Sequence, residues 1–202
     1  MLNWLREQMN SGELFGYFLQ ALPVSLLAGI TYLVIRLMKD REKKNWLDTI
    51  VRTLFVSYLT GLISLVVLPN NFWLNVLDGL MFGSWEEMGP VFSFGYFNLV
   101  PSIVKVMAGE LTLGSWVRTM LVMNVLMFVP LGFFLAYLTD KVSRKNIVYV
   151  SVLVPLLFET VQLMFGRSFD TDDLICNFIG LIIGIMIGLA LKAFCQKARE
   201  TS

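Results

Sequence analysis

The sequence contains no histidine and only two cysteines in 202 residues. Without histidine, the chain lacks the usual acid or base at neutral pH and the commonest protein ligand of transition metals. The two cysteines, Cys176 and Cys195, flank one apolar run and would lie about 28 Å apart on a helix that rises roughly 1.5 Å per residue. A disulfide between them is therefore excluded, and any proton transfer would have to use carboxylates.

Charged residues and nucleotide-binding motifs are also scarce. Lys, Arg, Asp and Glu make up 15% of the chain, compared with about a quarter of a typical soluble domain. The sequence has neither a glycine-rich phosphate loop followed by lysine nor a cluster of cysteines. These absences leave no support for nucleic-acid, nucleotide or redox functions, and we expect neither a cofactor nor a bound metal.

Long apolar runs dominate the sequence instead. Hydrophobic residues make up 56% of the chain, and the mean hydropathy is +0.70. A membrane-spanning helix needs about 20 apolar residues, and five such runs are present, at residues 15–38, 50–68, 116–138, 147–165 and 174–194. The sequence therefore predicts an all-α, polytopic membrane protein with about five transmembrane helices in one domain, residues 1–202. It does not indicate an oligomeric state.

Basic residues are unevenly distributed among the connections between these runs. Twelve of the 16 Lys and Arg residues fall on one side when the connections are assigned alternately to the two sides of the membrane. Because short loops rich in Lys and Arg stay in the cytoplasm, we expect a cell-membrane protein with its N-terminus outside and its C-terminus inside. Ten of the 15 acidic residues fall on the outer side, and an acidic face favours cationic partners.

One long connection, residues 69–115, joins the second and third runs. It is rich in aromatic residues and has little charge, and loops of this length without structure are uncommon. Because aromatic rings are stable at a membrane interface, we expect short amphipathic or re-entrant helices at the outer surface. The loop either anchors the protein there or covers a polar site nearby.

A carboxylate, Glu159, lies inside the fourth apolar run. A charge in that setting costs several kcal/mol and indicates a functional site. Gln162 lies on the same helix face, together with Ser151 and Pro155. Because proline also leaves one backbone carbonyl without its helical donor, we expect this stripe to face protein or a wet cavity.

Other polar residues are expected to meet Glu159 in the outer half of the membrane. The turn after the fourth run is short, so the fourth and fifth helices should be antiparallel neighbours, with Asn177 and Asp173 at the depth of Glu159. Asn124 in the third run reaches a similar depth. The mouth of this pocket would be formed by Arg118 and by the turn residues Arg167, Asp170 and Asp172.

These residues also have purely structural interpretations. Asp173 can stabilise the start of the fifth helix, and Arg167 can pair with an aspartate of the turn. Asn124 and Asn177 can join helices by hydrogen bonds. Glu159 is harder to explain in this way, because glutamine would make a structural hydrogen bond at lower cost.

The fifth run carries Gly180, Gly184 and Gly188, about one helical turn apart. Glycines at this spacing let a second helix approach closely, so we interpret them as a packing face. The sequence does not indicate whether the partner is the third run, the fourth run or a second copy of the chain.

Taken together, these residues resemble the VanZ family of bacterial membrane proteins. The resemblance covers about half of the chain and rests on the order and spacing of four groups. They are Asn98, Leu99 and Pro101; Asn124, Pro130 and Gly132; Glu159 and Gln162; and Gly166, Arg167, Asp170, Asp172, Asp173, Asn177, Gly180 and Gly184. The family often has an aromatic residue after the proline of the first group, where this chain has Ser102. The resemblance implies an integral membrane protein that, in some members, is associated with reduced susceptibility to teicoplanin and related lipoglycopeptides.

Two functions remain open from the sequence. In the first, an outer-leaflet polar pocket binds an amphiphile, either a lipoglycopeptide or an envelope lipid, and the lack of a nucleophile or metal set favours this function. In the second, the protein is an enzyme acting on a lipid-linked cell-wall substrate, with Glu159 as acid or base and Asp170 or Asp172 as its partner. A transporter is disfavoured, because the inner halves of the last three runs offer no polar path.

Overall fold

The structure is a computed structural model that describes residues 9, 14–39, 45–112 and 114–200. The prediction of an all-α membrane fold is confirmed, since five helices are long and apolar enough to cross a membrane. They are α2 (Leu14–Lys39), α3 (Trp46–Val66), α6 (Ser115–Leu138), α7 (Ile147–Met164) and α8 (Thr171–Glu200). The basic residues Arg41, Lys43 and Lys44, used above to orient the chain, lie outside the described residues.

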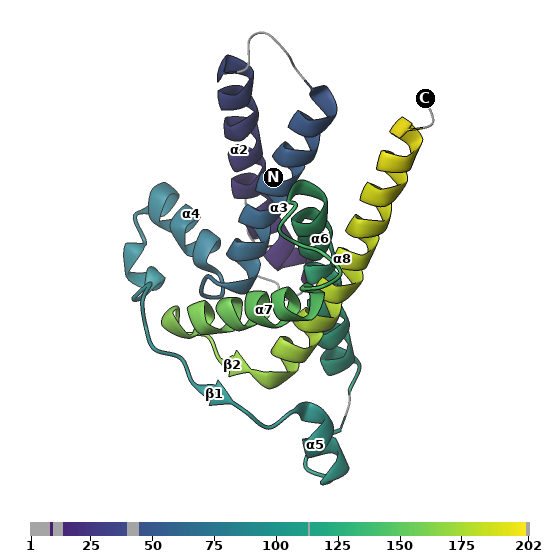
Figure 1. The fold of residues 1–202 in the computed structure, drawn as a ribbon. Coiled ribbons are helices and arrows are strands. Elements are labelled where there is room, and N and C mark those ends of the chain that lie inside the picture. Colours follow the sequence, from purple (N-terminus) through teal and green to yellow (C-terminus); the bar gives the residue numbers. More distant parts are fainter. Residues whose placement is uncertain (1–8, 10–13, 40–44, 113, 201–202) are drawn as a thin grey trace. The chain divides into compact units, whose positions relative to one another are not determined.

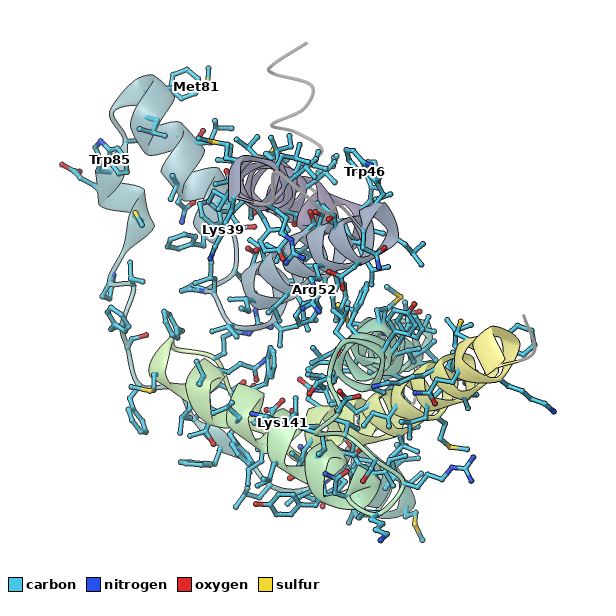
Figure 2. The ribbon with its side chains drawn as sticks, turned by 45° about the horizontal axis from the view of Figure 1, so that its top comes forward. Lys39, Trp46, Arg52, Met81, Trp85 and Lys141 are labelled. Carbon is cyan, nitrogen blue, oxygen red and sulfur yellow. The ribbon has the colours of Figure 1, made fainter. Side chains whose placement is uncertain are left out.

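The long connection contains short helices, as predicted. They are α4 (Phe72–Phe82), the 3-10 helix η1 (Trp85–Met88) and α5 (Ser102–Met107). Trp85, labelled with Met81 in Figure 2, packs against α4 at Gly79, where an added Cβ atom would lie 2.5 Å from the indole ring. The connection also contains a strand that was not predicted, β1 (Phe97–Asn98), which pairs with β2 (Phe169–Asp170).

The described residues form two compact units. The first comprises the described chain up to Phe94 together with Met164–Arg167, and the second comprises Gly95–Leu163 and the residues from Ser168 onward. Each unit is described by itself below. The grouping of residues 1–202 into one membrane domain stays a prediction.

In the first unit, α2 packs against α3 through small residues. An added Cβ atom at Gly29 would overlap the hydroxyl of Ser57, and one at Gly61 would lie 2.6 Å from Ser25 Oγ. The helix α3 begins at Trp46, four residues before the predicted run, because the Asn45 side chain accepts a hydrogen bond from the backbone N–H of the first turn and caps it. Polar capping thus extends this helix beyond its apolar segment.

In the second unit, the glycine stripe of α8 packs directly against α6 (Figure 1). Added Cβ atoms at Gly180 and Gly184 would overlap the backbone carbonyls of Val125 and Val129. The partner that the sequence left open is therefore the third apolar run. Near the end of this helix pair, Lys192 Nζ donates a hydrogen bond to Asp140 Oδ1 at 2.6 Å, which lowers the pKa of that carboxyl below its usual value.

The helix α7 crosses the α6–α8 pair, so the expectation that α7 and α8 run side by side as antiparallel neighbours is wrong (Figure 1). The connection between them contains β2, which pairs with β1, and it does not form a tight helical hairpin. The predicted polar stripe of α7 is nevertheless turned inward, since Ser151, Pro155, Glu159 and Gln162 are all buried. On the adjacent face, the ring of Phe158 contacts that of Phe128, with 5.2 Å between ring centroids.

Candidate functional site

A two-residue parallel pairing brings together two motifs that are far apart in the sequence. Phe97 of β1 pairs with Phe169 of β2, and Asn98 pairs with Asp170. The two aromatic rings lie 5.6 Å apart, and the backbone N–H of Phe169 donates to the Tyr96 carbonyl at 2.9 Å. This pairing fixes the long connection beside the acidic turn that precedes α8.

Asp170 joins three segments through its carboxylate. Its Oδ2 accepts a hydrogen bond from Asn98 Nδ2 at 2.7 Å, and its Oδ1 accepts one from the backbone N–H of Asp172 at 2.9 Å. The second bond is an N-cap of α8, in which the side chain of the residue before the helix accepts from the first turn. Lys105 Nζ donates to Asn98 Oδ1 at 2.9 Å and extends the network to α5.

The next two aspartates bind neighbouring helices. Asp172 accepts the backbone N–H of Ser102 at 2.8 and 3.0 Å, so a carboxylate from α8 caps the start of α5. Any residue other than proline supplies this N–H, and the serine that replaces the family's aromatic residue therefore does not affect the contact. Asp173, in the first turn of α8, accepts a hydrogen bond from Asn124 Nδ2 of α6.

Glu159 lies at the centre of these contacts and is 0% exposed. Its Oε2 accepts the backbone N–H of Asp170 at 3.0 Å, and its Oε1 accepts Asn177 Nδ2 at 3.5 Å. The carboxylate of α7 therefore binds both the strand β2 and the helix α8. We call these residues the polar network: Asn98, Glu159, Asp170, Asp172 and Asn177, together with the hydrogen-bonded pair Asn124 and Asp173.

The remaining predicted site residues lie at different places in the structure. Gln162 is buried on the α7 face that carries Glu159. Arg118 is exposed near the start of α6. Arg167 belongs to the first unit, where its Nη1 donates to the carbonyls of Leu65 and Leu68 at 3.3 Å and to Asn70 Oδ1 at 3.0 Å.

The pairing of Asn98 with Asp170 was not anticipated from the sequence. The only signal is that an aromatic residue precedes a polar one in both Phe97-Asn98 and Phe169-Asp170. Two residues are too few for the alternation by which strands are recognised. Lys105, which donates to Asn98, was not among the predicted site residues.

The network carries four carboxylates, yet within the described ranges no three metal-ligating side chains lie close enough together to hold an ion. Their oxygens accept hydrogen bonds from backbone N–H groups and side-chain amides instead. Asp170, Asp172 and Asp173 are half-buried, whereas Glu159 is enclosed. A carboxylate oxygen can accept more than one hydrogen bond, so the three aspartates can also receive donors from a ligand.

An exposed apolar segment lies directly beside these aspartates along the chain from β1 to α5. Met107 is 84% exposed, and six further apolar side chains of this stretch are at least 48% exposed. The apolar segment consists of Tyr96, Phe97, Leu99, Val100, Ile103, Val104 and Met107. An exposed apolar surface of this kind marks a site of contact with a membrane, a ligand or a partner.

A family model described as VanZ/LLP1 matches residues 55–192. The matched range contains both strands, α6, α7 and every residue of the polar network. No curated protein and no solved structure matched the chain.

Proposed function

The chain belongs to the VanZ/LLP1 family, and we propose that it is a cell-envelope membrane protein that binds teicoplanin-type lipoglycopeptides and lowers susceptibility to them. The apolar segment takes the acyl chain of the drug, and the aspartates of the polar network take its polar part. Both lie on the outer side of the cell membrane in this proposal, with the N-terminus outside and the C-terminus in the cytoplasm.

The observation that supports this proposal is that hydrogen bonds attach the exposed apolar segment to the carboxylates of the polar network. Hydrogen bonds from Asp170 and Asp172 hold the backbone and side chains at Asn98 and Ser102, and Glu159 holds Asp170 in turn. A segment fixed in this way presents its apolar side chains without the loss of conformational entropy that a flexible loop would suffer on binding. The network therefore preorganises an amphiphile-binding surface.

The charge of the site favours the drug over an anionic envelope lipid. Three half-buried aspartates lie beside the apolar segment. The basic side chain of Lys105 donates to Asn98 of the network, so the aspartates outnumber this positive charge. A negative surface attracts cationic groups and repels phosphate. An amphiphile with amine and hydroxyl donors next to an acyl chain matches both parts of the site.

The geometry gives less support to catalysis by Glu159 on a lipid-linked substrate. A general acid or base must come within hydrogen-bond distance of the proton that it transfers. Both oxygens of Glu159 already accept hydrogen bonds from Asp170 and Asn177, and the side chain is enclosed. Glu159 thus fits the role of a positioning residue for the aspartates.

Binding can be tested with a fluorescent lipoglycopeptide titrated onto purified full-length protein in nanodiscs. Ile103→Ser and Met107→Ser change exposed side chains of the apolar segment, so they leave the fold intact while removing contacts with the acyl chain. We expect each to weaken binding at least about tenfold, since burial of such a side chain contributes about 1.5–3 kcal/mol. Asp170→Asn should weaken binding as well.

The matched control is Glu110→Gln, which removes an exposed carboxylate of the same connection that has no side-chain contact with the network. Its affinity should equal that of the wild type. In cells with equal membrane levels of protein, the same variants should rank identically in drug susceptibility. The proposal is wrong if nanodiscs with the protein bind no more drug than empty nanodiscs.

A further inference from the structure

The connection between α6 and α7, residues 139–146, is short and carries three basic side chains. Lys141, Arg144 and Lys145 are all exposed, and Lys141 is labelled in Figure 2. None of the three side chains makes an ion pair or a hydrogen bond with any residue that the structure describes. Their positive charges are therefore uncompensated within the described chain.

Asn146 folds this connection into a defined turn. Its Oδ1 accepts the backbone N–H of Ser143 at 2.7 Å, and its Nδ2 donates to the carbonyl of Lys141 at 2.7 Å. The backbone N–H of Asn146 donates to the Ser143 carbonyl at 3.1 Å, and Val142 between them is buried. Because the backbone is already ordered, the basic side chains lose less conformational entropy on binding a partner than those of a flexible loop.

Lys192 of α8 covers the negative groups at this end of α6. Its Nζ donates to the carbonyl of Thr139 at 3.2 Å and to Asp140 Oδ1 at 2.6 Å. The carbonyl end of a helix carries a partial negative charge, and Asp140 is the acidic residue of the connection. Since Lys192 compensates both groups, the connection keeps an excess of positive charge.

The start of α7 adds to this positive charge. Arg144 and Lys145 lie directly before α7 in the sequence, and the first turn of a helix carries a partial positive charge. Guanidinium and ammonium groups form strong hydrogen bonds to phosphate oxygens. The connection therefore favours an anionic partner that carries phosphate.

The position of the connection favours a membrane lipid as the source of this phosphate. It joins two helices that are apolar enough to cross a membrane, and the ends of such helices lie near the lipid headgroups. Val148 and Tyr149, in the first turn of α7, are exposed, and tyrosine is enriched at the membrane interface. Exposed apolar and aromatic side chains thus follow the basic ones, as contact with a lipid surface requires.

The same basic residues also favour retention of this connection in the cytoplasm. That role requires positive charge but no defined fold. The turn formed by Asn146 and the pairing of Asp140 with Lys192 go beyond it. A surface that binds headgroups in the folded protein accounts for both features.

We propose that the connection between α6 and α7 binds the phosphate groups of anionic membrane lipids through Lys141, Arg144 and Lys145. The lipids belong to the leaflet on the same side as the connection, which we expect to be the cytoplasmic one. This binding surface is separate from the drug-binding function proposed above and does not depend on it.

Native mass spectrometry of the full-length protein in mild detergent tests this proposal. The probes are short-chain phosphatidylglycerol, phosphatidylcholine with the same chains, and inorganic phosphate. Wild type should bind phosphatidylglycerol more tightly than phosphatidylcholine. Lys145→Gln should weaken binding of phosphatidylglycerol about fivefold, and the triple variant Lys141→Gln, Arg144→Gln and Lys145→Gln about a hundredfold, because each basic residue near an anionic lipid surface contributes about fivefold.

Two controls separate this surface from general effects of charge or folding. The triple variant Lys141→Arg, Arg144→Lys and Lys145→Arg keeps the three charges and should bind phosphatidylglycerol as the wild type does. Lys39→Gln removes an exposed lysine at the end of α2, on an element that is not part of this connection, and should also leave the affinity unchanged. All variants should unfold at the temperature of the wild type, since the exchanged side chains make no contacts with described residues.

Three results would overturn the proposal. One is equal binding of phosphatidylglycerol by the wild type and the neutral triple variant. Another is a loss of affinity in Lys39→Gln as large as that in Lys145→Gln, which would show that any exposed lysine acts in the same way. The third is displacement of phosphatidylglycerol by inorganic phosphate but not by acetate at equal ionic strength, which would identify a site for soluble phosphate.

Discussion

Glu159 illustrates why a buried position can require a carboxylate even without catalysis. Its two oxygens face two donors, the backbone N–H of Asp170 and the amide of Asn177. Glutamine offers only one acceptor oxygen and would direct its NH₂ group at one of these donors. The argument that glutamine would serve a structural role at lower cost therefore does not hold at this position.

Replacing Glu159 should accordingly destabilise the second unit in graded fashion. Glu159→Gln leaves one buried donor unpaired, at a cost of about 1–3 kcal/mol, and Glu159→Ala leaves two and also creates a cavity. Thermal unfolding of the purified protein in detergent should rank wild type above Glu159→Gln above Glu159→Ala. Equal unfolding temperatures for wild type and Glu159→Gln would contradict the role of both oxygens.

A second residue-scale prediction concerns the cap that Asp172 places on α5. Only the backbone N–H of Ser102 takes part in this contact, so Ser102→Ala should be neutral. Ser102→Pro removes the donor, although proline is ordinarily favoured at a helix start, and should cost about 1 kcal/mol, the value typical of a lost cap. Limited proteolysis of the connection before α6 should be faster in Ser102→Pro, and a rate equal to that of Ser102→Ala would argue against the cap.

At the scale of elements, the helices could be predicted but their crossings could not. Apolar runs of about 20 residues identify membrane helices by themselves, and the start of α8 before its apolar run follows from the cap at Asp170. The connection from α7 to α8 contains β2, which pairs with β1 over only two residues in each strand. Long-range pairing of such short segments leaves no periodic signal.

The packing of α8 on α6 should be sensitive to a single methyl group. An added Cβ atom at Gly184 would meet the backbone of Val129 and Phe133, which cannot rotate away as a side chain can. Gly184→Ala should therefore destabilise the helix pair by about 1–3 kcal/mol, as overpacking typically does. The same substitution at Gly114 meets no atom within 4 Å and has a negative φ, so it should be neutral in the same detergent unfolding assay.

At the scale of the whole chain, the sequence named the residues of the candidate site but did not predict that Arg167 has its contacts elsewhere. Glu159 contacts Asp170 and Asn177, and Asn124 contacts Asp173, although α7 and α8 do not run side by side as the spacing argument assumed. Arg167, only three residues before Asp170, instead contacts the connection between α3 and α4. Proximity in sequence did not decide its partners, because the carbonyls at the end of a helix are strong acceptors for a guanidinium.

The orientation of the chain in the membrane is the prediction on which an outer binding site depends. It follows from the excess of Lys and Arg in alternate connections, and residues on two of these connections can be compared. Glu110 precedes α6 and Lys145 follows it, and both are exposed. With both native cysteines replaced by serine, Glu110→Cys should react with a membrane-impermeant maleimide in intact cells, and Lys145→Cys only after permeabilisation. The opposite pattern would place the aspartates and the apolar segment in the cytoplasm, where they could not meet an extracellular drug.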